Sequence, residues 1–172
     1  MPRILAVIIE WLVLLCVLWG IFFLSTLWHE CGHAVGYMLA TGDRHWHVRV
    51  GWGKRLIHTK PLTVNLLVFD GFFTPAEKKI DTKAKRIATL AGGPVFSLLL
   101  TAGLLALRFG GQSFASDFFA EGTVEFFLNT AIAVNLFIFV LSVAPVRYFY
   151  GEIKGLETDG LQILRAVRKR GD

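Results

Sequence analysis

Three long apolar stretches dominate the pattern of the chain, at about residues 4–40, 87–107 and 124–144. Each is long enough to cross a membrane, because a helix needs roughly 20 apolar residues to span the hydrocarbon core. The first stretch contains neither a proline nor a turn cluster, so we expect one long helix that tilts or protrudes, or else a helix broken near Gly20. We therefore predict an α-helical membrane protein, a single membrane-embedded domain over 1–172 with a core of three transmembrane helices.

The period changes between the first two stretches. Residues 45–50 alternate polar and apolar side chains, residues 51–53 are typical of a turn, and residues 55–60 and 62–69 are typical of strands. We predict a small, membrane-associated antiparallel β element over about 45–73. Because lipid-exposed strand edges are not tolerated, we expect helices to shield any part of it that enters the bilayer.

Several polar segments flank these elements. Asp70 precedes a glycine, and we interpret it as a turn former. Residues 74–86 are rich in charge, so we expect a solvated helix that leads into the second span. We also predict an amphipathic helix near the C-terminus, at about 160–170. Glu10, a lone charge in the first stretch, is expected near the membrane interface.

The composition agrees with a membrane protein in contact with lipid. Hydrophobic residues make up 54% of the 172 residues and the mean hydropathy is +0.55, which is too apolar for an ordinary soluble domain. The net charge of +5 does not indicate a nucleic-acid partner, because the basic residues form no patch with interleaved aromatics. Cys16 and Cys31 both lie in the first stretch, so no disulfide framework is expected. That stretch lacks a small-residue cleavage site, and we interpret it as mature structure.

The basic residues predict how the chain is oriented. Of the 18 Lys and Arg residues, ten lie within 44–86 and six lie from 147 onward, whereas Arg3 and Arg108 lie on the other side. The positive-inside rule then places the N-terminus outside and both the β element and the C-terminus in the cytoplasm. A compact chain with this asymmetry is typical of a bacterial inner membrane.

The motif His29-Glu30-Cys31-Gly32-His33 lies inside the first apolar stretch. Two histidines four residues apart share one helical face, so both imidazoles can bind one metal ion. Glu30 is then close to a metal-bound water, for which it can act as general base. Ionisable groups at membrane depth are costly and indicate function. The alternative is a purely structural, hydrogen-bonded cluster.

A catalytic zinc ion requires three protein ligands and an open position, so a third ligand must come from elsewhere in the chain. His45 and His47 alternate on the predicted surface strand and are expected to be interfacial or solvated. Asp159 follows a span that returns to the side of the histidines, and it opens a helix. It is either the third ligand or an ordinary N-cap, and the spacing alone does not decide between the two.

Motifs from the three spans occur in a distinctive order: His29 to His33 in the first, Ala91-Gly92-Gly93-Pro94 in the second, and Pro145 followed by Asp159-Gly160 after the third. This order resembles the site-2 protease family of intramembrane zinc metalloproteases, over the three-span core. The resemblance implies that His29, His33 and Asp159 bind one zinc ion and that Glu30 activates the water. It also implies that the β element presents the substrate in extended form.

The resemblance further implies a set of substrate-binding residues. The family usually has asparagine at the positions of Ser97 and Ser142, and Asn135 matches another asparagine common in the family. Together with Gly93 and Pro94, these residues are expected to bind the substrate. Serine can still hydrogen-bond a peptide backbone, with one hydroxyl in place of the separate donor and acceptor of an amide.

We expect an intramembrane zinc endopeptidase that cleaves a transmembrane segment of another membrane protein near the cytoplasmic face, as in regulated intramembrane proteolysis. A regulatory membrane partner is left open, and no PDZ or CBS-like domain is expected, because the three spans use up the chain. One alternative is a catalytically inactive relative that binds zinc and holds a membrane substrate. A weaker one is a transporter fragment whose ionisable residues line an ion path. The intact Glu30 favours the enzyme, because a pure metal site does not need a base beside its ligands.

Overall fold

The computed structural model describes residues 2–75, 79–110, 122–149 and 153–168. In chain order these residues form α1 (Pro2–Thr41), β1 (Trp46–His58), β2 (Leu62–Pro75), α2 (Lys83–Gly110), α3 (Thr123–Val143) and α4 (Asp159–Arg168). The helices α1, α2 and α3 are long and apolar enough to cross a membrane, as predicted. The small β element is confirmed as two paired strands.

Helix α1 is continuous over 40 residues, and Gly20 does not interrupt it. At 1.5 Å per residue it is about 60 Å long, roughly twice the thickness of a hydrocarbon core. It ends where Gly42 adopts a left-handed conformation (φ 70°) and donates its backbone N–H to the carbonyl of Met38 at 2.9 Å. The unbroken helix is therefore the correct alternative, and in a bilayer it must tilt or protrude.

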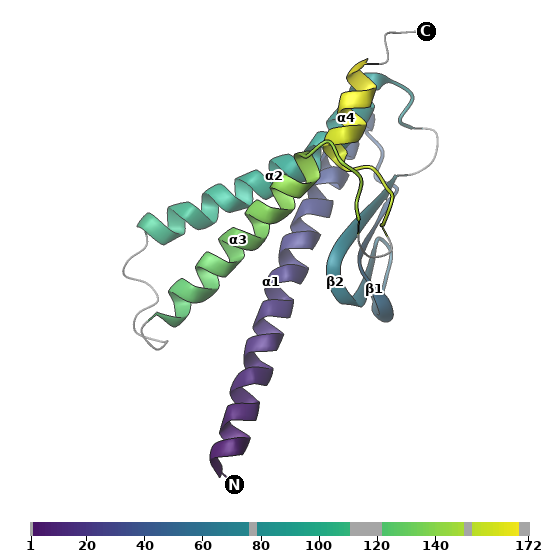
Figure 1. Ribbon diagram of the computed structural model, residues 1–172. Coiled ribbons are helices and arrows are strands. Elements are labelled where there is room, and N and C mark those ends of the chain that lie inside the picture. Colours follow the sequence, from purple (N-terminus) through teal and green to yellow (C-terminus); the bar gives the residue numbers. More distant parts are fainter. Residues whose placement is uncertain (1, 76–78, 111–121, 150–152, 169–172) are drawn as a thin grey trace.

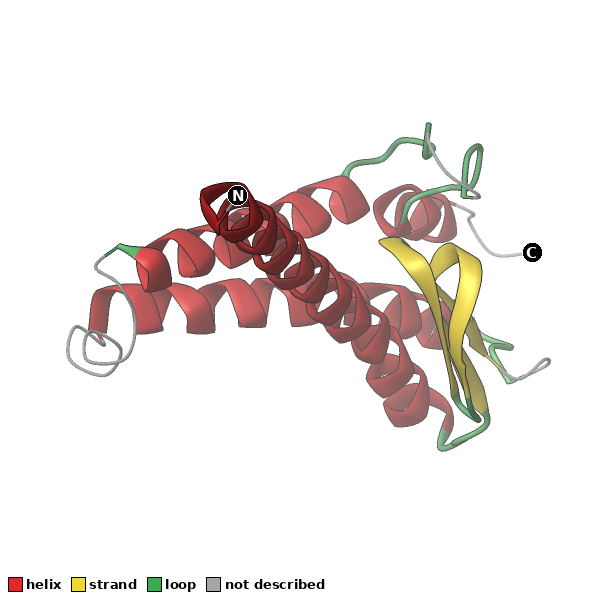
Figure 2. Cartoon of the chain, turned by 90° about the horizontal axis from the view of Figure 1, so that it is seen from below, coloured by secondary structure: helices red, strands yellow, loops and turns green. Residues whose placement is uncertain are grey.

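The other elements are arranged on two sides of α1. Helices α2 and α3 run side by side on one side of it, and the two strands lie on the other (Figure 2). The short helix α4 packs near the C-terminal end of α1, beside the start of α2 and the end of α3, whereas the N-terminal end of α1 extends alone beyond the other elements (Figure 1). The elements from distant parts of the sequence thus meet around the second half of α1.

The boundaries of the two strands differ from those predicted for the β element. Gly51 and Gly53 have φ of 76° and 84°, and the pairing register shifts around them. The expected turn at this point is therefore an irregularity inside β1 and not a boundary between two strands. Because the strands fold back, Val48 pairs with both Leu62 and Phe73.

The C-terminal part of β2 forms an edge of this sheet. Residues 71–75 pair with 46–50 on one side, and within the described ranges no strand pairs with their other side. The sheet is attached to α1 by a small core, in which three buried valines pack against apolar side chains that include Trp19, Phe22 and Phe23 of α1. This attachment holds the free edge of β2 beside the second half of α1.

Two local predictions are wrong. Asp70 does not form a turn, because it lies within β2 with only 4% of its surface exposed. The segment 74–86 is not a helix throughout. Its first two residues continue β2, since Pro75 pairs with Trp46, and residues 79–82 are not helical. At residues 74 and 75, tertiary strand pairing has overridden the local preference for helix.

The start of α2 follows from its N-terminal cap. The hydroxyl of Thr82 accepts a hydrogen bond from the backbone N–H of Lys85 at 3.3 Å, so Thr82 caps α2, which begins at Lys83. Helix α4 begins at Asp159, one residue before the predicted start. Residues 76–78 of the predicted charged helix and the predicted end of the last helix at 170 lie outside the described residues.

The interior between the long helices is polar, and their outer surface is apolar. Many of the large apolar side chains of α1, α2 and α3 are exposed. Polar side chains are buried instead, among them Ser25, Thr26, Thr89, Ser97, Thr101, Asn135 and Ser142. A water-soluble protein shows the opposite distribution, whereas small polar side chains between helices are typical of packing in lipid.

Candidate metal centre

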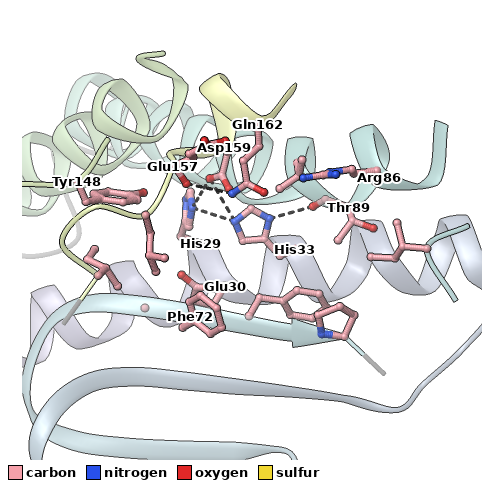
Figure 3. Close-up of a pocket in the computed structure, with 17 residues that line it drawn as sticks. His29, Glu30, His33, Phe72, Arg86, Thr89, Tyr148, Glu157, Asp159 and Gln162 are labelled. Carbon is pink, nitrogen blue, oxygen red and sulfur yellow. Dashed lines mark hydrogen bonds and ion pairs between the residues drawn. The ribbon is translucent and has the colours of Figure 1, made fainter. Parts of the chain in front are cut away.

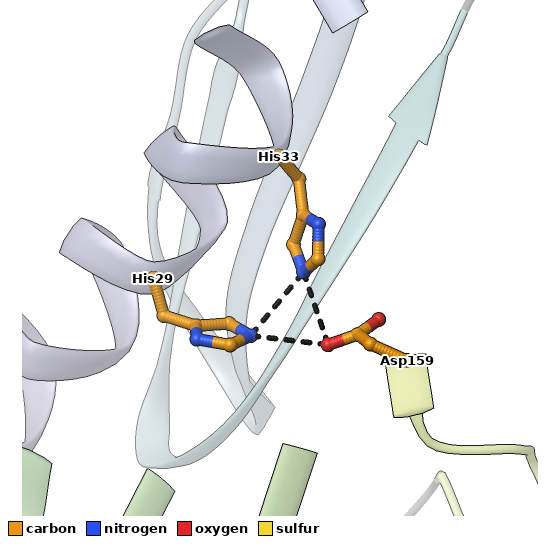
Figure 4. Close-up of side chains that lie close together, drawn as sticks. All are labelled: His29, His33 and Asp159. Atoms are coloured by element: carbon orange, nitrogen blue, oxygen red, sulfur yellow. Dashed lines mark hydrogen bonds and ion pairs between the residues drawn. The ribbon is translucent and has the colours of Figure 1, made fainter. Parts of the chain in front are cut away.

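Three buried side chains converge at the C-terminal half of α1. His29 and His33 lie one turn apart on this helix, and Asp159 is the first residue of α4 (Figure 4). The two histidine Nε2 atoms are 3.2 Å apart, and Asp159 Oδ2 lies 3.4 Å from each of them. The fold therefore brings Asp159 to the histidines, as the ligand hypothesis requires.

The three facing atoms can hold a metal ion. An ion with four ligands at about 2.0–2.1 Å in tetrahedral geometry has its ligand atoms roughly 3.3 Å apart. The observed separations of 3.2–3.4 Å match this spacing. Two imidazole nitrogens and one carboxylate oxygen also leave the fourth position open, as in catalytic rather than structural sites.

The Nδ1 atom of each histidine, which is not one of the three facing atoms, has its own partner. His33 Nδ1 lies 2.9 Å from the backbone carbonyl of Thr89, and His29 Nδ1 lies 2.8 Å from the hydroxyl of Ser97. Because a carbonyl oxygen only accepts, His33 must carry its proton on Nδ1, which leaves the Nε2 lone pair for a metal in the neutral ring. Both partners are on α2, so the packing of α2 against α1 orients the imidazoles.

Asp159 is held in place by the residue before it. The fully buried Thr158 caps α4: its hydroxyl lies 3.4 Å from the backbone N–H of Leu161, and its carbonyl accepts from the N–H of Gln162 at 3.0 Å. The same hydroxyl reaches back toward the carbonyl of Val146 at 3.0 Å. The capping role that the sequence offered to Asp159 thus belongs to Thr158, and the Asp159 carboxylate is left to face the histidines.

Asp159 lies outside the long apolar helices and carries the charge that a metal site needs. Burial acts to raise the pKa of its carboxyl, but the imidazoles of His33 and His29 outweigh burial and hold that pKa below its ordinary value. Asp159 is therefore an anionic carboxylate, the form that binds metal.

Glycines on α1 and α2 allow the two helices to approach closely at this point. A side chain on Gly32 would meet the backbone carbonyl of Gly92, and one on Gly92 would meet that of Gly32. A methyl group at Gly93 would meet Nε2 of both His29 and His33. Gly93 therefore leaves free the space in which an ion would be bound.

The metal-binding group opens into a cavity of about 610 Å³, which Glu30 also lines (Figure 3). Glu30 is buried and packs against Gly71 of β2, where any side chain would collide with its carboxylate. In the view of Figure 3, Glu30 and Phe72 lie on one side of the histidines, and Asp159 and Gln162 lie on the other. A second cavity of about 60 Å³ continues from Glu30 between α1, α3 and β2.

The residues expected to bind substrate are all buried. Ser142 lines the small cavity, and Ser97 contacts His29. Gly93 faces the histidines, next to the buried Pro94. Asn135 is 1% exposed, donates from Nδ2 to the hydroxyl of Ser25 at 2.8 Å, and has no hydrogen-bond partner for Oδ1 in the described part of the chain. Their binding of a substrate stays a prediction, and Ser97 orients a candidate ligand as well.

The histidines of the β element lie apart from this centre. His45 is exposed and contacts the Asp43 carboxylate at 2.7 Å, and His47 contacts the hydroxyl of Thr63 at 3.0 Å. Neither belongs to the group with metal-binding geometry that the described residues contain. The expectation that they are surface or interfacial residues agrees with these positions.

Sequence reasoning missed several residues of the site. Thr89 contributes through its backbone carbonyl, and Arg86, Tyr148 and Gln162 line the large cavity from α2, the α3–α4 segment and α4. Only Thr158 had a usable signal, because a threonine just before a predicted helix is a typical N-cap. The others depend on which helices pack together.

Comparisons with family profiles, with characterised proteins and with solved structures gave no match for this chain. The resemblance to the site-2 proteases therefore rests on the motifs of this sequence.

Proposed function

We propose that this protein is an intramembrane zinc endopeptidase, which hydrolyses a peptide bond in or near a transmembrane segment of a membrane-protein substrate. One observation carries the proposal: the His29, His33 and Asp159 triangle shares its cavity with Glu30, between helices apolar enough to cross a membrane. A buried carboxylate beside an open metal site is what peptide hydrolysis needs. Such a carboxylate has no catalytic role in a metal site that is only structural.

The ligand set suits zinc. Two imidazoles and one carboxylate with an open fourth position are typical of zinc hydrolases, in which the bound ion polarises the scissile carbonyl and acidifies a water molecule. The carboxylate of Glu30 takes up the proton of the attacking water and delivers it to the nitrogen of the leaving amine. Ser97 and the Thr89 carbonyl keep the two imidazole rings oriented during this step.

The free edge of β2 supports a role in binding an extended substrate. Gly71, Phe72 and Phe73 lie on this edge and also line the metal cavity. A helical peptide bond is shielded by its own hydrogen bonds, so a transmembrane substrate must unwind locally before it can be cleaved. Unpaired N–H and C=O groups of a strand edge can stabilise the unwound segment as an added strand.

The distribution of basic residues supports an orientation with the N-terminus outside and the β element and C-terminus in the cytoplasm, as in a bacterial inner membrane. In that orientation the metal centre lies toward the cytoplasmic face, because His29 and His33 are in the second half of α1. The substrate is then cut near its cytoplasmic end.

The proposal is tested by measuring bound zinc and cleavage of a model transmembrane peptide in reconstituted vesicles. We expect Glu30→Gln to keep zinc and to lose cleavage by a factor of at least about 10², because general-base catalysis contributes that much or more. Asp159→Ala should lose both zinc and cleavage. Glu10→Gln is the matched control, since it changes the other carboxylate of α1, which is exposed and far from the site.

Unchanged cleavage in Glu30→Gln contradicts the protease. Zinc binding without any cleavage by the wild-type protein favours the inactive, substrate-holding relative instead. Full zinc affinity in Asp159→Ala means that the third ligand lies elsewhere.

A further inference from the structure

Arg86 places a positive charge on the wall of the metal cavity. It lies in the first turn of α2 and lines the same cavity as His33, Glu30 and Asp159. Thr89, one turn further along α2, accepts the hydrogen bond of His33. A group bound by Arg86 would therefore lie close to the metal centre, on the side of the histidines away from Glu30 in Figure 3.

The charged groups beside Arg86 are already matched by partners. Asp159 faces two histidines, and Glu157 pairs with Arg147 at 3.4 Å and with Arg165. Arg86 differs from them: no carboxylate within the described ranges lies at ion-pair distance from its guanidinium. An exposed arginine thus lines the cavity, with hydrogen-bond donors that are available to a ligand.

The chemistry of this position favours an anion with two oxygens. A guanidinium presents paired N–H donors that match a carboxylate in a two-pronged geometry. The N-terminal end of α2 adds a partial positive charge in the same place. A lipid phosphate would also suit an arginine near a membrane surface, but Arg86 lines the cavity of the metal centre, which a peptide substrate must enter.

We propose that Arg86 is a specificity-determining residue, which binds a carboxylate of the substrate next to the bond that is cleaved. The inference rests on the proposed proteolysis and gives its substrate a chemical feature. The carboxylate is either an acidic side chain in the cytoplasmic flank of the transmembrane segment or the C-terminal carboxylate of a short tail.

The test measures peptide binding to zinc-loaded protein carrying Glu30→Gln, in neutral phosphatidylcholine vesicles, so that cleavage does not interfere. The probes share an apolar segment of roughly 20 residues and a polar flank in which Glu, Gln or Lys is moved through successive positions. These peptides have an amidated C-terminus. A further peptide has the Gln flank and a free C-terminal carboxylate.

We expect either the Glu side chain or the free terminus to tighten binding by about tenfold over the neutral peptide, as one charge-assisted hydrogen-bonded pair does. Whichever probe gains affinity identifies the source of the carboxylate. Arg86→Gln should remove the preference, and Arg86→Glu should transfer it to the Lys peptide. Lys85→Gln is the matched control, because Lys85 is adjacent in sequence but pairs with Asp81 at 2.7 Å.

Three results would overturn the proposal. The first is equal weakening of every peptide by Arg86→Gln, which would make Arg86 a structural residue. The second is a carboxylate preference that survives this substitution. The third is an effect of Arg86 only on association with anionic vesicles, which would make it a lipid anchor. A wild-type protein that shows the Arg86-dependent preference but never cleaves a bound peptide contradicts the proteolysis and leaves carboxylate binding intact.

Discussion

The two halves of α1 belong to one unbroken helix but have opposite surroundings. At its N-terminal end, residues 3–13 are all exposed and all but Arg3 and Glu10 are apolar; Ile4 and Trp11, for example, are 68% and 61% exposed. In the C-terminal half polar side chains are buried, including Ser25, His29 and His33. Glycine packing against α2 occurs only in this second half, among the glycines of α1.

This contrast shows where to look for function in an apolar helix. When the surroundings are lipid, apolar side chains need no protein partner, whereas a polar side chain must find one inside the protein. Apolar side chains then lie on the outer surface of the molecule, and polar side chains lie in its interior, where the candidate site is. The same substitution should therefore have very different effects in packed and in unpacked positions.

The largest effect is expected where packing and metal binding coincide. Gly93→Ala places a methyl group against both histidine Nε2 atoms and should weaken zinc binding by more than about 100-fold, beyond the loss that an outer hydrogen bond causes. Gly103→Ala is the control on the same helix, because no atom lies within 4 Å of its added methyl group. Titration with a competing zinc chelator measures both variants. Equal zinc affinities would mean that the ion is bound away from the His29–His33 pair.

A smaller effect, on stability, is expected from alanine substitutions at one glycine in each half of α1. Gly32→Ala should destabilise the protein by about 1–3 kcal/mol, because its methyl group would meet Gly92 and lie 2.7 Å from Cβ of Phe96. Gly20→Ala meets no atom within 4 Å and should be neutral or slightly stabilising, since alanine favours helix over glycine. Unfolding in a denaturing detergent measures the difference. Similar stabilities for the two variants would contradict the close approach of α1 and α2.

The smallest effect concerns the orientation of one ring. Ser97→Ala removes the hydroxyl that contacts His29 Nδ1 and should weaken zinc binding by about tenfold, the lower end of outer-shell effects. Thr101→Val removes a hydroxyl one turn away, which bonds the carbonyl of Ser97 and no histidine, and should leave zinc affinity unchanged. If both variants bind zinc like the wild type, the Ser97 contact does not orient the ligand.

The parts of the fold that depend on local pattern could be predicted from the sequence. The three apolar helices follow from hydropathy, and His29, Glu30 and His33 follow from the period of a helix, which places them without knowledge of any other element. The C-terminal cap at Gly42 is equally local. These features need only a few neighbouring residues to define them.

The rest depends on contacts between distant segments. Asp70 is next to a glycine, which suggests a turn, but the pairing of β1 with β2 makes it a buried strand residue. The sequence left Asp159 open between two roles, and the neighbouring Thr158 resolves it by taking the cap. Arg86 carries no sequence signal at all, because its position on the cavity wall depends on how α2 packs against α1 and α4.

The position of Asp159 late in the chain has a consequence for biosynthesis. The histidine pair is translated early, but the three-ligand group requires α3 to be in place and Thr158 to cap α4. At about 5–20 residues per second, a nascent chain spends several seconds with only two of the three ligands. A chain that stalls or is truncated before residue 159 carries an incomplete site, so completion of translation itself sets the moment at which the metal centre can form.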